Sequence, residues 1–225
     1  MSQSETVGAQ AVIDRAVEAF RRGQPVCIHD AADREGETDL VYPAHAVTPE
    51  AVARLRNDAG GLICVALPDA VAVEFDLPFL QDSLTHPTAA NHDLSYDDRS
   101  SFSLTVNHRE TRTGITDEDR SLTILELATA AESPEQVDFA GTFRAPGHVH
   151  LLRAAPGLLG ERRGHTELGI ALAQAAGVPP AVVVCEMLDD STGKALSPQD
   201  AADYASSEGF VYLEGKTLVE QFSEP

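Results

Sequence analysis

Helix-like and strand-like patterns of apolar and polar residues alternate along this 225-residue chain. Apolar side chains recur every three or four residues from Ala9 to Arg22 and from Thr166 to Ala176, which predicts two amphipathic helices. Gly23 and Gly177 directly follow these stretches and predict where the helices end. Capping hydroxyls predict three further helices, which begin at Thr48-Pro49, Thr116 and Ser197-Pro198.

Short apolar runs between these helices predict buried strands. The runs are Pro25–His29, Leu62–Leu67, Ala181–Cys185 and Phe210–Leu213. The segment from Ser101 to Val106 alternates in period two, so we expect Phe102, Leu104 and Val106 on its buried face. Because helices and strands alternate without a repeat or a long linker, the sequence predicts a single domain over residues 1–225, an α+β fold in which helices cover a mixed sheet.

The composition is strongly acidic. Asp and Glu number 36 against 16 Lys and Arg, giving a net charge of -20, and the only lysines are Lys194 and Lys216. Such a charge repels nucleic acid and anionic membranes, so neither is an expected partner. A lysine-poor acidic surface also predicts a halophilic protein, adapted to concentrated salt that screens the repulsion. The alternative is that the chain is simply acidic.

The apolar runs and the cysteines indicate where the chain works. No apolar run reaches the roughly 20 residues that span a bilayer, and charged residues interrupt the N-terminal stretch, so we expect neither a membrane span nor a signal peptide. Cys27, Cys64 and Cys185 each lie inside an apolar run without the spacing of a zinc site. This predicts reduced thiols and a cytoplasmic protein.

The first candidate site is an acidic segment that follows the strand predicted to end at His29. From Asp30 to Asp39 it holds five carboxylates and one arginine, most of them within Asp33-Arg34-Glu35-Gly36-Glu37-Thr38-Asp39. As a loop bent at Gly36, it can bring its acids toward a common point, and oxygen ligands of this kind suit a hard cation such as Mg2+. The alternative is a solvated acidic loop on an acidic surface.

The second candidate site is the segment Arg162-Arg163-Gly164-His165-Thr166-Glu167, where a helix is predicted to start. A helix N-terminus presents free N–H groups and the positive end of the helix dipole, and the two arginines add further donors. The segment therefore predicts an anion site, with phosphate as the expected anion. His165 is placed to coordinate a metal or to move a proton at the same spot. The alternative for a histidine at a helix start is a structural role.

Three further residues end or interrupt the predicted strands. Glu186 follows the run that ends at Cys185, where ligands of open sheets gather, so it is a candidate general acid or base. His148, in the predicted turn Ala145-Pro146-Gly147-His148, is its candidate partner, with a plain turn histidine as the alternative. Cys64 is expected to be a small buried hydrophobe unless the site opens beside it.

Several other motifs accompany the two candidate sites along the chain. They are Gly60-Gly61-Leu62-Ile63-Cys64, Thr113-Gly114-Ile115-Thr116 with Asp119-Arg120, Pro146-Gly147-His148-Val149 and Cys185-Glu186-Met187. Together, in this order, the motifs resemble those of the 3,4-dihydroxy-2-butanone 4-phosphate synthase family of riboflavin biosynthesis. The resemblance implies an α/β/α three-layer sandwich, a homodimer with sites at the subunit interface, and a lyase that converts D-ribulose 5-phosphate to 3,4-dihydroxy-2-butanone 4-phosphate and formate.

The resemblance also implies roles for individual residues. By position, Glu35 and His165 are the metal ligands, shared by two Mg2+ or Mn2+ ions. His148 and Glu186 are essential for catalysis, and Glu37, Cys64 and Asp30 line the site, the first two as further candidate catalytic residues. The residues implied to bind the sugar phosphate are Arg34, Glu35, Asp39, Arg162, Arg163, Gly164, His165, Thr166 and Glu186. No fused cyclohydrolase domain is expected after Pro225.

Two other functions use part of the same pattern. A different metal-dependent sugar-phosphate isomerase or aldolase needs the same acids and arginines, but it releases no formate. A nucleotide- or RNA-binding module of a related sandwich fold would be expected to have a basic groove with lysines, and this chain has two lysines.

Overall fold

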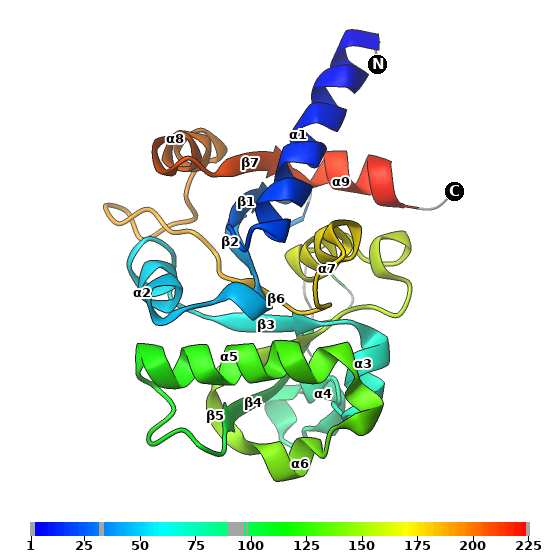
Figure 1. The fold of residues 1–225 in the computed structure, drawn as a ribbon, viewed down its shortest axis with the longest axis vertical. Helices are drawn as coiled ribbons and strands as arrows, with labels where there is room; N and C mark the ends of the chain where they lie inside the picture. The colour runs from blue at the N-terminus through cyan, green and yellow to red at the C-terminus, as the bar shows by residue number, and fades with distance from the viewer. Residues whose placement is uncertain (1–2, 32–33, 90–96, 98, 224–225) are drawn as a thin grey trace.

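The chain folds around a mixed sheet, which the computed structural model describes together with its helices over residues 3–31, 34–89, 97 and 99–223. The sheet has seven strands in the order β4-β5-β3-β6-β2-β1-β7 (Figure 1). Neighbours β1 and β7, and β3 and β5, run parallel, whereas the other pairs are antiparallel. The strands are β1 Val26–His29, β2 Thr38–Pro43, β3 Cys64–Leu67, β4 Phe102–His108, β5 Phe143–Arg153, β6 Val182–Val184 and β7 Val211–Glu214.

Helices cover both faces of the sheet. They are α1 Gln3–Arg21, α2 Pro49–Asn57, α3 Asp69–Glu74, α4 Leu80–Ser83, α5 Asp117–Glu132, α6 Phe139–Thr142, α7 His165–Ala176, α8 Pro198–Glu208 and α9 Gly215–Phe222. Short 3-10 helices lie at Ala44–Ala46, Pro87–Ala89, Pro134–Gln136 and Leu158–Gly160. Among the described residues, none of the helices is both long and apolar enough to cross a membrane.

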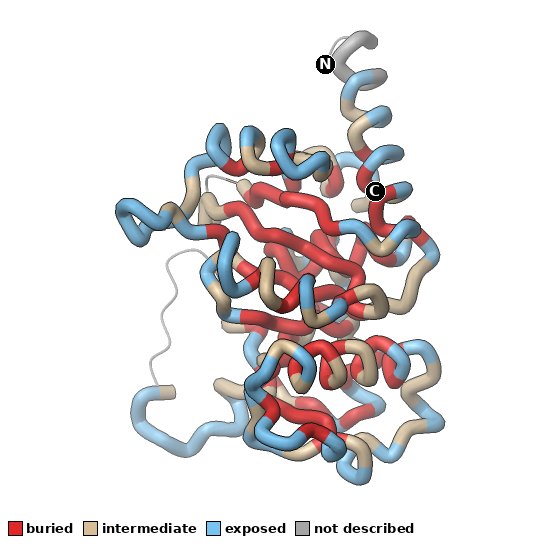
Figure 2. The backbone as a smooth tube through the Cα atoms, turned by 60° about the vertical axis from the view of Figure 1, so that its left-hand side comes forward, coloured by how far each residue is buried: buried red, intermediate tan, exposed pale blue. Residues whose placement is uncertain are grey.

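Two apolar clusters, one on each face, make the three layers. On one face, Leu55 of α2 and Leu127 of α5 pack in the cluster that contains Val65 of β3. On the other face, Phe20 of α1 and Ile170 of α7 pack in a separate cluster. Figure 2 shows the buried strands between these helices. The predicted α/β/α sandwich with a mixed sheet is confirmed.

The helix boundaries follow from the capping residues. Thr48 accepts a hydrogen bond from the Ala51 N–H at 3.3 Å, and Thr116 accepts one from the Asp119 N–H at 3.1 Å. Gly177 ends α7 with a left-handed backbone at φ 67°, which glycine adopts without steric cost. The cap-based predictions of α2, α5, α7 and α8 are therefore confirmed, while α1 begins earlier than predicted, at Gln3.

The five predicted strands are confirmed as β1, β3, β4, β6 and β7, with errors in detail. Of the expected buried face of β4, Val106 is buried, but Phe102 is 37% exposed while Ser103 is buried. β4 is an edge strand whose pairing with β5 shifts register after Phe102, so simple alternation does not hold along it. Leu62 is 39% exposed and lies before β3 rather than in it.

Two polar segments that the sequence analysis treated as non-strand also lie in the sheet. Thr38 and Asp39 belong to β2, so the acidic segment is not a loop along its whole length. His148 is part of β5 and does not lie in a separate turn. Both corrections change where candidate site residues stand, because a strand fixes which face each side chain is on.

Candidate active site

Both candidate sites of the sequence meet at one cavity of about 320 Å³. The acidic segment contributes through β2 and the connection before it, and the second segment through the start of α7. Cys64 of β3 and Glu186, just after β6, complete the polar lining. The lining residues are Glu35, Asp39, Cys64, Ser100, Ser101, Phe102, Leu152, Arg162, His165, Thr166, Val184 and Glu186.

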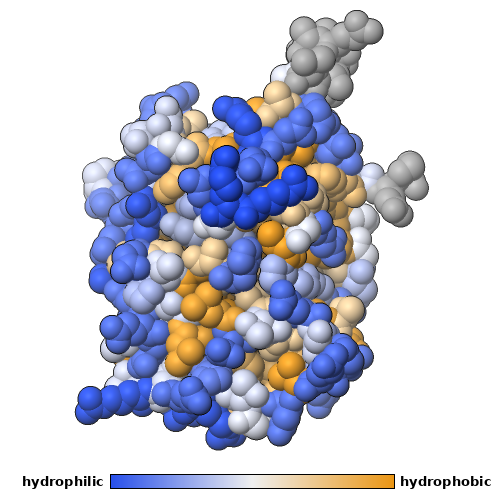
Figure 3. Space-filling model, in the orientation of Figure 1, coloured by the Kyte–Doolittle hydropathy of each residue, from blue (hydrophilic) through white to orange (hydrophobic). Residues whose placement is uncertain are grey.

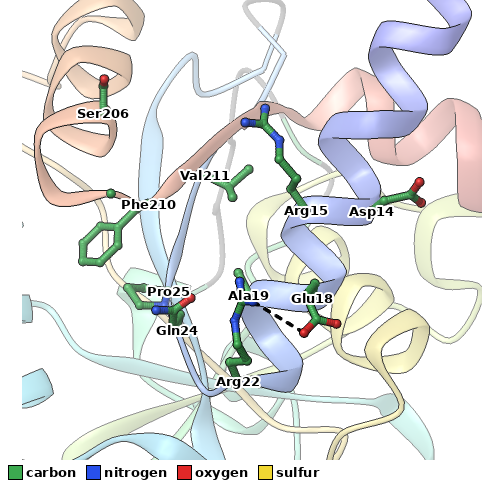
Figure 4. Close-up of a pocket in the computed structure, with 11 residues that line it drawn as sticks. Asp14, Arg15, Glu18, Ala19, Arg22, Gln24, Pro25, Ser206, Phe210 and Val211 are labelled. Atoms are coloured by element: carbon green, nitrogen blue, oxygen red, sulfur yellow. Dashed lines mark ion pairs between the residues drawn. The ribbon is translucent and has the colours of Figure 1, made fainter.

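A larger hollow of about 650 Å³ lies elsewhere, between α1 and the α8–β7 turn (Figure 4). Its charged residues balance, because Asp14 and Glu18 stand beside Arg15 and Arg22. Arg22 and Glu18 form an exposed ion pair at 3.6 Å. None of the predicted site residues lines this hollow, so the smaller cavity is the candidate active site.

Asp30 shapes the connection between β1 and β2. Its Oδ1 accepts hydrogen bonds from the N–H groups of Gly36 at 2.8 Å and Glu37 at 3.2 Å. Gly36 has φ 67°, a left-handed conformation that favours glycine. The connection therefore folds around Asp30 and brings Glu35 to the cavity, whereas Arg34 contacts Asp97 and is not part of the lining. Asp33, also predicted for this site, lies outside the described residues.

His165 is the centre of a carboxylate cluster. Its Nδ1 lies 3.3 Å from Asp39 Oδ1 and 3.6 Å from Glu35 Oε2. Its Nε2–H donates a hydrogen bond to the carbonyl oxygen of Ile28 at 3.1 Å, so in the neutral imidazole the lone pair is on Nδ1, which faces the acidic side. A histidine held in this way is prepared to ligate a metal through Nδ1.

The donor set fits a divalent cation. Asp30, Glu35 and His165 each offer one ligand atom, and these atoms lie within 4.8 Å of one another. Asp30 Oδ2 and Asp39 Oδ1 are buried and meet no hydrogen-bond partner among the described residues. Oxygen ligands with one imidazole suit Mg2+ or Mn2+. The sequence predicted Glu35 and His165 as ligands, and the geometry adds Asp30 as a candidate.

Burial and mutual repulsion set the protonation of the cluster. Burial, against the opposing charge of His165, raises the pKa of Asp39 to about 8. Burial lowers the pKa of His165, but the charge of Asp39 and the adjacent Glu35 outweigh it and raise the pKa to about 9. Contact with His165 is the main cause of a lowered pKa of Glu35. Without a metal ion, the protons on Asp39 and His165 thus offset the negative charge that a bound cation would otherwise offset.

Two further carboxylates and a thiol lie beside this cluster. Burial raises the pKa of Glu186, and burial together with the charges of Glu186 and Glu35 raises the pKa of Glu37. A raised pKa makes each carboxylate a stronger base, which suits a group that takes up and returns a proton. Burial also raises the pKa of the Cys64 thiol well above its usual value, so Cys64 borders the cavity as a neutral thiol.

Two arginines contact the same carboxylate oxygen near the start of α7. Arg162 Nε donates to Asp97 Oδ2 at 2.6 Å, and Arg34 Nη2 donates to the same oxygen at 3.1 Å. The fully buried Glu167 accepts a hydrogen bond from Arg162 Nη1 at 2.8 Å and fixes that side chain. A Cβ at Gly164 would collide with Arg162 and crowd Arg34. Glycine at 164 therefore leaves room for a two-arginine anion site.

Some predicted residues are not part of the cavity lining. Four of them stand next to lining residues: Asp30, Arg34, Glu37 and Gly164. Arg163 is exposed and is not part of its lining, although its neighbours Arg162 and Gly164 form the anion site. His148 is exposed on β5 and does not line the cavity either, so a pairing with Glu186 is not formed around this cavity. Its described hydrogen bonds go to Asn107.

Part of the lining was not predicted from the sequence. Ser100, Phe102, Leu152 and Val184 reach the cavity only through the pairing of β4, β5, β3 and β6, which no local pattern encodes. Asp97 belongs to no motif, and its role became visible only through its contacts with the arginines.

Comparison with known proteins identifies one family. The family model described as 3,4-dihydroxy-2-butanone 4-phosphate synthase matches residues 14–221. The protein of that name from Methanosarcina mazei is 51% identical, with the match covering 93% of this chain and 90% of the relative. The Archaeoglobus fulgidus protein of the same name is 48% identical, with 93% of each chain covered.

Solved structures agree with these matches. A crystal structure of 3,4-dihydroxy-2-butanone 4-phosphate synthase in complex with two magnesium ions aligns with a TM-score of 0.80 at 30% identity, covering 93% of this chain and 95% of that one. The Candida albicans enzyme aligns with a TM-score of 0.78 at 33% identity, covering 94% and 97%.

Proposed function

Because the chain belongs to the 3,4-dihydroxy-2-butanone 4-phosphate synthase family, we propose that it converts D-ribulose 5-phosphate to 3,4-dihydroxy-2-butanone 4-phosphate and formate in riboflavin biosynthesis. The chain is therefore a lyase. The observation that carries the proposal is the junction, at the start of α7, of a carboxylate–histidine cluster with a two-arginine anion site. A sugar phosphate needs both sites. The carboxylate–histidine cluster serves its oxygens near the reacting carbons, and the two arginines serve its phosphate.

Glu35 and His165 would hold the metal, with Asp30 beside them. We assign two Mg2+ or Mn2+ ions to the site, a choice supported by the related structure that contains two magnesium ions. When bound, such ions polarise substrate oxygens and make the neighbouring C–H group more acidic.

The protein groups bind the substrate and move its protons. Arg162, Arg34 and Thr166 would bind the phosphate, with Gly164 leaving them space. Glu186 and Glu37 are suited to take and return a proton, because burial raises the pKa of each carboxyl.

Formate release tests the reaction. Purified protein incubated with ribulose 5-phosphate and Mg2+ is expected to form one formate for each sugar phosphate consumed. An isomerase or aldolase working at the same cavity would consume the sugar phosphate without releasing formate. That outcome would replace the proposed reaction with the alternative one.

We further propose a homodimer in which His148 completes the site of the other subunit. The support is its position, since His148 is exposed and outside the cavity, while the family resemblance makes it essential for catalysis. In this arrangement each cavity would combine Glu35 and His165 of one chain with the histidine of a second copy.

Mixed dimers of Glu35→Gln and His148→Ala chains test this arrangement. If His148 acts across the interface, one site of each mixed dimer carries both substitutions and the other carries neither. Random mixing then restores about a quarter of the unmodified activity, because half of the dimers are mixed and each has one intact site. Activity no higher than in the separate variants would show that His148 acts within its own chain.

The remaining assignments concern the whole protein. We assign residues 1–225 to one domain of a cytoplasmic protein that has a sugar phosphate as its small-molecule partner and binds neither nucleic acid nor membrane. The charge of -20 supports adaptation to high salt.

A further inference from the structure

The geometry points to Asn107 as a positioning residue that holds the imidazole of His148 with Nδ1 as a hydrogen-bond acceptor and the proton on Nε2. The catalytic meaning of this contact rests on the proposed function, in which His148 takes part in the reaction. The contact itself can be measured without turnover.

His148 stands on a bulge that β4 supports with side chains. Val106 pairs with Val149, but the next residue, Asn107, pairs with Arg144, so residues 145–148 of β5 form an excursion from the ladder. The Gly147 N–H donates to Thr105 Oγ1 at 3.1 Å, and the His148 N–H donates to Asn107 Oδ1 at 2.8 Å. Two β4 side chains thus replace the backbone acceptors that a regular strand would supply.

The backbone contact fixes which way the Asn107 amide faces. A backbone N–H can only donate, so the atom that receives it must be the amide oxygen. The Nδ2 group, a pure donor, then lies 3.2 Å from His148 Nδ1. Oδ1 lies slightly farther from the same nitrogen, at 3.3 Å, and also accepts the backbone N–H, so the shorter contact of Nδ1 is with the donor group. We therefore assign Nδ1 as the acceptor and the proton of neutral His148 to Nε2.

Two glycines hold Asn107 in this position. A Cβ at Gly114 would overlap the Asn107 amide group, and Gly114 has φ 88°, which favours glycine. A Cβ at Gly147 would overlap the backbone of Val106 and Asn107. The side chain of Asn107 is 4% exposed, so the amide has little freedom to turn.

Asp119 fixes the loop that carries Gly114. Its carboxylate accepts hydrogen bonds from the Gly114 N–H at 2.8 Å and from the Thr113 N–H at 3.1 Å, at the start of α5. This links two motifs of the sequence that the metal and anion sites leave unexplained, Thr113-Gly114-Ile115-Thr116 and Pro146-Gly147-His148-Val149. Both serve the orientation of one imidazole.

The sharpest test is Asn107→Asp, read by 15N NMR of the histidine side chains. An aspartate keeps the acceptor for the His148 N–H but has no donor for Nδ1, so it favours the tautomer with the proton on Nδ1. His148 resonances are assigned by their loss in His148→Gln. Asn57→Asp, on the exposed surface of α2, adds the same charge and is the matched control.

We expect the Nε2–H tautomer in the unmodified protein and in Asn57→Asp, and the Nδ1–H tautomer in Asn107→Asp. In the formate assay, Asn107→Asp is expected to lower kcat about 10-fold or more with KM nearly unchanged. A predominant Nδ1–H tautomer in the unmodified protein would overturn the proposal. This readout does not depend on the folding of Asn107→Asp, because the His148→Gln spectrum serves only to assign the resonances. An unchanged tautomer in a folded Asn107→Asp protein would do the same.

The proposed reaction and the proposed role of Asn107 are tested by independent measurements. Absence of formate from the unmodified protein contradicts the proposed reaction, whereas the NMR result alone decides how Asn107 holds His148.

Discussion

His165 and its acidic neighbours share protons that a metal ion must displace. The pKa of Asp39 is raised to about 8 and that of His165 to about 9, so the metal-free folded state holds these protons to higher pH than the unfolded chain does. At pH values between the ordinary pKa values, near 4 for Asp and near 6.5 for His, and these raised ones, the folded state binds more protons than the unfolded chain. The cluster therefore makes the metal-free fold less stable as pH rises.

This sign gives a pH-dependent response to metal. Mg2+ competes with protons at His165 and Asp39, so its stabilising effect grows as those groups lose protons. We expect saturating Mg2+ to raise the Tm several degrees more at about pH 8.5 than at about pH 6, relative to protein in EDTA. Differential scanning fluorimetry measures this, with Glu35→Gln as the control that should lose the response. Equal shifts at both pH values would contradict the protonation scheme.

Gly164 separates the anion site from the metal site. In Gly164→Ala the new methyl group displaces Arg162 and Arg34, so KM for ribulose 5-phosphate should rise about 10-fold while Mg2+ affinity stays nearly unchanged. Gly160→Ala is the matched control, because a Cβ at position 160 meets nothing within 4 Å. Steady-state kinetics with isothermal titration of Mg2+ distinguish the two effects. An equal KM in both variants would show that the two arginines do not bind the phosphate.

At the residue level, the sequence predicted the charged groups better than their partners. Glu35, His165 and Arg162 belong to compact motifs whose residue types indicate metal and anion binding. The roles of Asp97 and Asn107 depend on contacts with Arg162 and His148, far away in the sequence, so no local pattern could predict them.

The start of α7 is the element on which both sites depend. The helix lies against the sheet through Gly169, where a Cβ would come within 2.8 Å of Val182 on β6. His165, at the start of the helix, thereby contacts Ile28 of β1 and Asp39 of β2. The position of the helix on the sheet is therefore as important to the site as its residues.

A bulkier residue at 169 should loosen that contact. Gly169→Val forces α7 away from Val182, and we expect the free energy of unfolding to fall by about 1–3 kcal/mol. Urea unfolding measures the change, with Gly160→Ala again as the control. Unchanged stability would show that α7 can move without cost.

At the element level, helices were predicted well because their caps are local. Thr48, Thr116 and Gly177 mark helix ends through contacts with their immediate neighbours. β2 was missed because it begins with Thr38 and Asp39. These polar residues are buried beside the site and do not form the apolar run that predicts a buried strand. β5 was missed because Pro146 and Gly147 interrupt its pattern at the bulge that carries His148.

For the whole molecule, charge is the dominant surface property. Figure 3 shows one face covered mostly by hydrophilic residues, with smaller apolar areas between them. A net charge of -20 on a 24.0 kDa protein favours expansion by repulsion unless salt screens it. The sequence predicted this balance directly, because charge is a sum over residues and does not depend on their arrangement.

Salt should therefore stabilise the fold. We expect the Tm to rise by several degrees or more when KCl increases from about 0.1 M to about 2 M, because screening weakens the repulsion among carboxylates. Thermal unfolding followed by circular dichroism measures this. A Tm that stays constant or falls over this range would contradict adaptation to salt.

We propose that Glu35 and His165 hold the metal needed for a formate-releasing reaction. The most direct measurement is 13C NMR of [4-13C]ribulose 5-phosphate incubated with Mg2+ and the protein, because the proposed reaction releases C4 as formate. We predict labelled formate with the unmodified protein and with Glu74→Gln on the exposed surface of α3, and a rate at least about 100-fold lower with Glu35→Gln or His165→Ala. Label that stays in a sugar phosphate or its fragments without labelled formate, or labelled formate at the same rate from folded Glu35→Gln protein, would contradict this assignment.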